Sequence, residues 1–261
     1  MTLTLDRPEA RNALDTAAIA LLAAALDAAN ADRAVRAVVL RANGPSFSAG
    51  GDFSSFRALI ADAPPVGGAD PIATHNRAYG ALLERMRDLD VPTVAVVAGA
   101  AVGGGVGLAA VCDIVIATPQ ASFRLPEVTL GLPPAQVAPF VADRIGRSRA
   151  LRAMVTGHVI AADEAARIGL VDILATDDAG AARELGDVLA ALGRAQPDAV
   201  RSTKQILARD RTGERASVLD FAAERFAAAL RSGSASEGLA AFAERRPAAW
   251  VQPMGAASQE S

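Results

Sequence analysis

Four glycines stand within five positions of the segment AVVAGAAVGGGVGLAA, residues 95–110, between one apolar run and the next. They are Gly103, Gly104, Gly105 and Gly107. A glycine inside a helix or strand costs about 0.5–1 kcal/mol relative to alanine because it loses more backbone freedom on folding. A cluster this dense therefore indicates that another group approaches the main chain closely at this point.

The composition predicts a cytoplasmic protein with an aliphatic core. Hydrophobic residues make up 51% of the 261 positions and aromatic residues only 4%, so the interior must consist mainly of Ala, Val, Leu and Ile. A net charge of −3 with no basic block argues against a nucleic-acid partner. No secretory signal opens the chain and no apolar run reaches the roughly 18–20 residues of a membrane span, so we expect no membrane partner.

The residue types that carry metal and nucleophile chemistry are sparse. Cys112 is the only cysteine, which excludes a disulfide framework and a cysteine zinc pattern, and we interpret it as a small buried residue beside the run DIVIA. His75 and His158 have no visible triad partner, and the pattern G-x-S-x-G is absent. We therefore predict neither a metal site nor a nucleophilic serine.

Strand-like and helix-like runs alternate in the first two-thirds of the chain, which predicts an α/β fold. Asp15 and Thr16 are candidate N-caps of the first helix. After about residue 175 the pattern is helical only, so we divide the chain into a core, 1–175, and a C-terminal helical region, 176–261, which packs on the core or on a neighbouring subunit. The strand-like runs are LTL, 35–42, 92–99 and 112–119, and the helical runs are 15–30, 71–88, 178–193, 197–208, 214–231 and 234–246.

The glycine cluster has three interpretations. Residues 105–110 formally fit the dinucleotide pattern G-x-G-x-x-A, but the acidic residue that follows, Glu127, does not end the next strand, which disfavours a nicotinamide enzyme. The second interpretation is close helix–strand packing without chemistry. The third is a helix N-terminus that presents backbone N–H groups to an oxygen that becomes negative.

An oxyanion site normally uses two donors, and the segment GPSFSAGGDF, residues 44–53, offers the second. Gly50 and Gly51 follow a strand-like run there, and their lack of side chains lets the backbone turn sharply and leaves its N–H groups uncovered.

Five segments occur in the same order as in the crotonase superfamily, the enoyl-CoA hydratases and isomerases, and the chain resembles that family from its first residues to about 175. The segments are LDRPEARNALD, FSAGGDF, AVVAGAAVGGGVGLAAVCDIVIAT, ASFRLPEVTLGLPP and TGHVIAADEAARIGLVD, with a weaker match through EGLAAFAERR. The resemblance implies a spiral of ββα repeats followed by a helical oligomerisation region, assembled as a homotrimer or a dimer of trimers. It also implies an acyl-CoA thioester substrate and no separate cofactor. Family members normally carry a strand before the one at TLTLDRP, so either the true start lies upstream or the first hairpin is incomplete, and an incomplete hairpin would leave a sheet edge unpaired.

The resemblance also assigns site residues. The backbone N–H groups of Gly51 and Gly104 would hold the thioester oxygen, and Glu127, in the PE motif, would be the acid/base. Many hydratases of the family carry another glutamate three residues after the second oxyanion glycine, where this chain has Gly107. Coenzyme A would lie near residues of the first segments, and two C-terminal residues would reach its nucleotide end, often from a neighbouring subunit. These are Arg11, Ala13, Ala49, Asp52 and Phe53, and then Phe242 and Arg245.

The departure at Gly107 leaves three functions open. A single glutamate can support hydration of a 2-enoyl-CoA or the shift of a double bond between C2 and C4. The segment LPEVTLGLPPAQVAPF is similar to the branch that contains isohexenylglutaconyl-CoA hydratase, which favours hydration. The third possibility is an acyl-CoA-binding protein whose catalytic pair has decayed.

Overall fold

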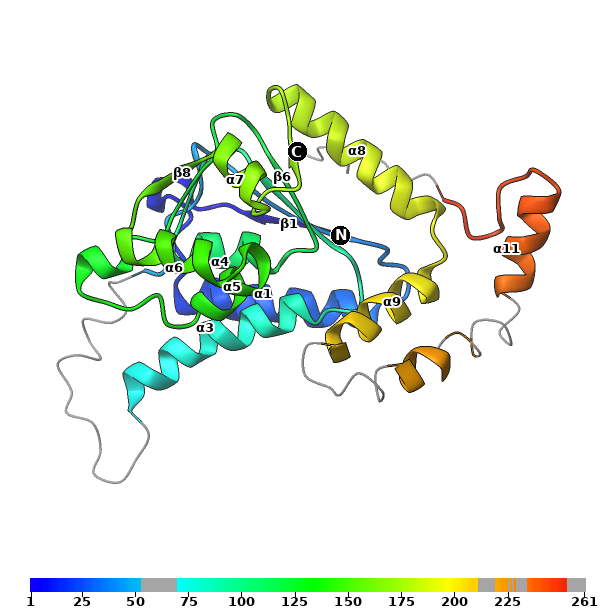
Figure 1. The fold of residues 1–261 in the computed structure, drawn as a ribbon, viewed down its shortest axis with the longest axis horizontal. Helices are drawn as coiled ribbons and strands as arrows, with labels where there is room; N and C mark the ends of the chain where they lie inside the picture. Colours follow the sequence, from blue (N-terminus) through cyan, green and yellow to red (C-terminus); the bar gives the residue numbers. More distant parts are fainter. Residues whose placement is uncertain (53–69, 211–218, 225, 227, 229–233, 253–261) are drawn as a thin grey trace.

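The computed structural model describes residues 1–52, 70–210, 219–224, 226, 228 and 234–252, and it has an α/β fold (Figure 1). The strands of the described residues form two sheets. The five-stranded sheet is parallel, in the order β1-β2-β4-β6-β9, and the four-stranded sheet has the order β3-β5-β7-β8, with β8 antiparallel to β7. The strands are β1 Thr2–Leu5, β2 Val38–Ala42, β3 Ser46–Ser48, β4 Thr93–Val97, β5 Ala100–Val102, β6 Ile114–Ala117, β7 Ser122–Arg124, β8 Val159–Ala161 and β9 Ile173–Leu174.

Three strands of the first sheet each lead within a few residues into a strand of the second. β2 leads into β3, β4 into β5 and β6 into β7, and helical elements follow. This succession is the spiral of ββα repeats that the resemblance to the crotonase superfamily implies. The sequence pattern did not predict β3, β5 and β7, because three residues are too few to show the alternation that distinguishes a strand from a turn. β1 lies at one edge of its sheet.

Two helices of the core, Thr16–Ala31 and Pro71–Arg87, begin at side chains that cap them. Asp15 accepts a hydrogen bond from the backbone N–H of Ala18 and caps the first of them as predicted, whereas Thr16 is its first helical residue and not the cap. Asp70 caps the second by accepting the N–H of Ile72. The helical elements are η1 Pro8–Ala10, α1 Thr16–Ala31, α3 Pro71–Arg87, α4 Gly104–Val111, η2 Glu127–Leu130, α5 Ala138–Ile145, α6 Arg147–Thr156, α7 Ala162–Ile168, α8 Asp178–Arg194, α9 Pro197–Asp210 and α11 Ser234–Ala243.

Helix α4 lies at the centre of the core. Every residue from Gly105 to Val111 is buried, and the helix contacts α3, α5, β3 and β5. Its glycines and alanines let these neighbours come close, which a helix of larger side chains would prevent. Cys112, at its C-terminal end, is 2% exposed and behaves as the small buried residue expected.

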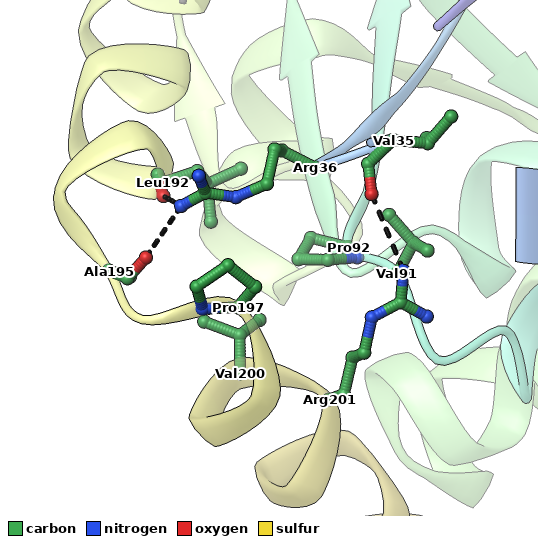
Figure 2. Close-up of a pocket in the computed structure, with 9 residues that line it drawn as sticks. All are labelled: Val35, Arg36, Val91, Pro92, Leu192, Ala195, Pro197, Val200 and Arg201. Atoms are coloured by element: carbon green, nitrogen blue, oxygen red, sulfur yellow. Dashed lines mark hydrogen bonds between the residues drawn. The ribbon is translucent and has the colours of Figure 1, made fainter. Parts of the chain in front are cut away.

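The described residues after 175 are helical apart from their connections, and α8 packs on the face of the parallel sheet away from α4 (Figure 1). Figure 2 shows a small pocket where α8 and α9 meet the sheet. The Arg36 guanidinium donates a hydrogen bond to the carbonyl of Ala195 at 2.6 Å. The guanidinium of Arg201, a residue that is 8% exposed, donates to the carbonyl of Val35 at 3.5 Å. Arginines at this junction therefore tie the helices to the sheet.

Some expectations fall on segments that are not described. More than half of the predicted helical run 214–231 lies outside the described residues. Phe53, the last residue of GPSFSAGGDF, lies outside them as well, together with the residues that follow it up to position 69. In the described part of the chain, no helix is long and apolar enough to cross a bilayer.

Candidate active site

Two glycine turns meet at the centre of the site. Gly50 has a φ of +86°, and a Cβ atom built on it would lie 2.6 Å from the carbonyl oxygen of Val102 and 3.0 Å from the backbone nitrogen of Gly104. Only glycine fits such a contact between two backbones. The turn after β3 is therefore held directly against the start of α4.

Buried polar side chains hold the first turn. Ser48, which is fully buried, donates its hydroxyl hydrogen to the carbonyl of Asn12 at 2.8 Å and accepts the N–H of Gly50 at 3.1 Å. The Asn12 amide donates to the carbonyls of Asn43 and Ser46 at 2.9 and 2.8 Å. Each polar group is thus paired within the protein, as burial requires.

Gly51 stands at the open end of this turn. The backbone hydrogen bonds to the neighbouring strand segment run from Leu14 N–H to the Gly50 carbonyl and from Asp52 N–H to the Leu14 carbonyl, at 2.7 and 3.1 Å. Neither bond uses the N–H of Gly51, and among the described residues no atom beyond its chain neighbours lies within 4 Å of a Cβ built there. Within the described part of the chain, the first oxyanion candidate is therefore exposed.

The second turn begins α4. Gly103 has a φ of +51°, stands at the N-cap and donates its N–H to the Arg124 carbonyl at 2.8 Å. Gly104 is the first helical residue, whose N–H has no partner within the helix. A Cβ on Gly105 would lie 2.6 Å from the Ser48 carbonyl oxygen, so this glycine serves the close packing that was one of the three interpretations.

Glu127 lies against the second turn. It begins η2, and its Oε1 would lie 2.9 Å from a Cβ on Gly103. Its Oε2 is buried without a hydrogen-bond partner among the described residues. Burial raises the pKa of the Glu127 carboxyl above its ordinary value. An unpaired buried carboxyl oxygen with a raised pKa is suited to exchanging a proton with a bound molecule.

Tyr79 lies against Gly104 and Gly107 and was missed by the sequence analysis. Its hydroxyl donates to the carbonyl of Gly104. A Cβ on Gly107 would lie 3.0 Å from the Tyr79 Oη and 3.2 Å from side-chain carbons of Leu83 and Val137. The one signal that could have pointed to this residue is that it is the only tyrosine of an aromatic-poor chain.

The residues predicted to contact coenzyme A divide into two groups. Arg11 and Ala49 meet through a backbone hydrogen bond of 2.8 Å, and Ala13 and Asp52 flank the Leu14–Gly51 bridge in the same pair of segments. Phe53 lies outside the described residues.

The C-terminal pair lies elsewhere in the chain. Helix α11, which carries the 85% exposed Phe242 and precedes Arg245, is at the far end of the molecule from α4 (Figure 1). A single chain therefore does not bring Phe242 and Arg245 to the glycine turns. Within the described residues, no three His, Cys, Asp or Glu side chains gather as metal ligands would.

Comparisons with known proteins identify the family of the chain. Residues 1–253 match the family model for enoyl-CoA hydratase/isomerase. A probable enoyl-CoA hydratase of Bacillus subtilis is 33% identical over 245 residues, which cover 94% of this chain and 92% of that protein. The 2,3-dehydroadipyl-CoA hydratase of Escherichia coli is 32% identical over 249 residues, 94% of this chain and 92% of that protein.

Solved structures give the same result. An enoyl-CoA hydratase/isomerase from Marinobacter aquaeolei has a TM-score of 0.91 at 38% identity and covers 96% of each chain. Pseudomonas aeruginosa AtuE has a TM-score of 0.91 at 41% identity, covering 96% of this chain and 95% of that one. By sequence and by fold, the chain belongs to the enoyl-CoA hydratase/isomerase family of the crotonase superfamily.

Proposed function

We propose that the protein hydrates a 2-enoyl-CoA thioester, with Glu127 as its single carboxyl acid/base and the N–H groups of Gly51 and Gly104 as an oxyanion hole. The observation that carries this proposal is the buried, unpaired Oε2 of Glu127 on a side chain in contact with Gly103. A carboxyl group there is next to the position where the thioester would lie. Coenzyme A enters as part of the substrate, so we propose no separate cofactor.

The reaction needs one carboxyl group if that group acts twice. A water oxygen forms a bond to C3 while one of its hydrogens passes to the Glu127 carboxylate. The electron pair of the C2=C3 bond moves toward the thioester, whose oxygen becomes negative and is stabilised by the two N–H groups. Glu127 then returns the proton to C2, which gives a 3-hydroxyacyl-CoA.

The names of the relatives support hydration, because they include several probable enoyl-CoA hydratases and a 2,3-dehydroadipyl-CoA hydratase. The glycine at position 107 favours a second candidate, a double-bond isomerase, since moving a proton between C2 and C4 requires one base and no water. A decayed acyl-CoA-binding protein would keep the glycine turns but show no turnover.

Oligomer assembly is part of the proposal. We propose a homotrimer or a dimer of trimers, in which α11 of a neighbouring subunit supplies Phe242 and Arg245 to the nucleotide end of coenzyme A. The exposure of Phe242 and the position of α11 away from α4 support this arrangement (Figure 1). Arg245 would then pair with a phosphate through a charge-assisted hydrogen bond.

A panel of 2-enoyl-CoA and 3-enoyl-CoA thioesters, including crotonyl-CoA and a branched glutaconyl thioester, tests the reaction by mass spectrometry in H₂¹⁸O. We expect label in the product at the rate of turnover, and Glu127→Gln should lower that rate roughly a hundredfold to ten-thousandfold. Glu84→Gln is the matched control, because Glu84 is an exposed glutamate paired with Arg77 at 2.7 Å.

Each alternative has its own result. A double-bond shift without added oxygen would make the protein an isomerase. Binding without turnover, unchanged in Glu127→Gln, would leave the decayed binding protein. Label incorporation that does not depend on Glu127 would refute the assigned mechanism.

A further inference from the structure

Tyr79 occupies the space that a second glutamate would need. Its Oη would lie 3.0 Å from a Cβ on Gly107 and 3.2 Å from a Cβ on Gly104. The phenol therefore fills the notch that two missing side chains leave beside the first turn of α4. Glu127 lies against Gly103, and consecutive Cα atoms are about 3.8 Å apart, so the carboxyl and the phenol flank the same stretch of backbone.

The hydrogen bond of Tyr79 determines what its oxygen can do. A phenol has one hydrogen to donate, and this one is committed to the carbonyl of Gly104. The oxygen has two lone pairs, of which one faces the backbone N–H of Leu108 and the other is left for a further partner. The pKa of Tyr79 is raised above its ordinary value by burial and by the nearby charge of Glu127. The phenol is therefore neutral when Glu127 is ionised, and it can accept a hydrogen bond without taking a proton.

We propose that Tyr79 holds the attacking water, with its Oη accepting one water hydrogen while Glu127 removes the other. This proposal rests on the proposed hydration. The hydrogen that points to Tyr79 stays on oxygen and becomes the hydroxyl hydrogen of the product, and the hydrogen that passes to Glu127 ends on C2. Tyr79 thus supplies the positioning that the absent carboxylate at position 107 would give, without a second negative charge.

A purely structural role for Tyr79 predicts something different. The phenol could merely fix the Gly104 carbonyl and, through it, the N–H groups of the turn. Loss of the hydroxyl would then weaken every reaction that depends on the oxyanion hole. Exchange of the C2 hydrogen of a saturated acyl-CoA is such a reaction, because it needs Glu127 and the enolate but no attacking water.

The test compares these two reactions in Tyr79→Phe. The first is hydration of the 2-enoyl-CoA from the panel that the wild type turns over fastest, and the second is deuterium exchange at C2 of the corresponding saturated thioester in D₂O. We expect kcat for hydration to fall about tenfold, the loss of one hydrogen bond, with KM and the exchange rate within about twofold of wild type. Thr74→Val is the matched control, since it removes another hydroxyl of α3 that donates to a backbone carbonyl, that of Asp70 at 3.0 Å.

Three results would overturn the role of Tyr79. An equal fall in hydration and exchange would show that the residue only supports the turn or the fold. Unchanged hydration would show that it does not hold the water. If the wild type adds labelled oxygen to no thioester of the panel, the proposed hydration and the role of Tyr79 fail together, whereas the first two results leave hydration standing.

Discussion

The two glycine turns of the site are held in different ways. The turn at Gly50 and Gly51 is held from beneath by the buried Ser48 and Asn12, whose hydrogen bonds run to backbone groups. The turn at Gly103 and Gly104 has side chains against it, the carboxyl of Glu127 at Gly103 and the phenol of Tyr79 at Gly104.

The first turn therefore depends on how the backbones pack, and the second turn carries the side chains proposed to take part in the reaction. Substitutions at the first turn disturb how two backbones fit together, so we expect them to reduce stability and activity together. Substitutions around the second turn alter groups that border the place where substrate would lie, so we expect them to alter the reaction more than the fold. Functional sites often combine a rigid support with groups that are poorly satisfied on their own.

The largest effect is expected for Gly50→Ala, which tests the rigid turn. A Cβ there would meet the Val102 carbonyl oxygen at 2.6 Å, and backbone atoms cannot move aside as a flexible side chain can. Overpacking typically costs about 1–3 kcal/mol, and a positive φ costs alanine roughly 1–2 kcal/mol more. The free energy of unfolding, measured in urea, should fall by the sum of these two costs, and the hydration activity should be lost.

Gly169→Ala is the matched control for that measurement. Gly169 has nearly the same φ, +84°, but among the described residues no atom beyond its chain neighbours lies within 4 Å of a Cβ built on it. It should show only the backbone cost. Equal losses of unfolding free energy at the two positions would mean that the backbones at Gly50 and Val102 move apart to admit the methyl group. The first turn would then not be rigid, and its contrast with the second turn would be refuted.

A smaller effect is expected for Gly107→Ala, which tests the chemical flank. The new Cβ would crowd the Tyr79 Oη at 3.0 Å and push the phenol from its place, so hydration should slow about three- to tenfold with little loss of stability. The two groups touch, so their effects should not add. In the Tyr79→Phe background the same alanine should therefore cost less. Full additivity in this double-mutant cycle, measured by kcat, would contradict the contact.

The sequence predicts the parts of this molecule that repeat over many residues. Helix α1 and its cap at Asp15 follow from local pattern, and the approach of Glu127 to the glycines accords with the family motif that contains it. The assigned roles of Gly51, Gly104 and Glu127 stay predictions until they are measured.

Contacts between distant segments could not be predicted in this way. Tyr79 and Gly104 are 25 positions apart, and their hydrogen bond depends on how α3 packs on α4. Helical periodicity shows that one face of 71–88 is buried but not which residue of another helix it meets. The same limit applies to the proposed place of Phe242 near coenzyme A, which would depend on a neighbouring subunit.

The smallest expected effect concerns the stability of the chemical flank itself. Burial raises the pKa of Glu127, so the folded protein holds this proton more tightly than the unfolded chain does. As the pH rises through the ordinary carboxyl range, the unfolded chain ionises first and the wild type loses stability until the pH passes the raised pKa. Glu127→Gln cannot ionise and escapes this loss. Urea unfolding between pH 4 and 8 should therefore show the variant gaining on the wild type as the pH rises, with the gain complete above the raised pKa. If the difference in unfolding free energy between the two proteins is constant across this range, burial does not destabilise the ionised Glu127 carboxylate. The electrostatic difference between the two turns would then be refuted.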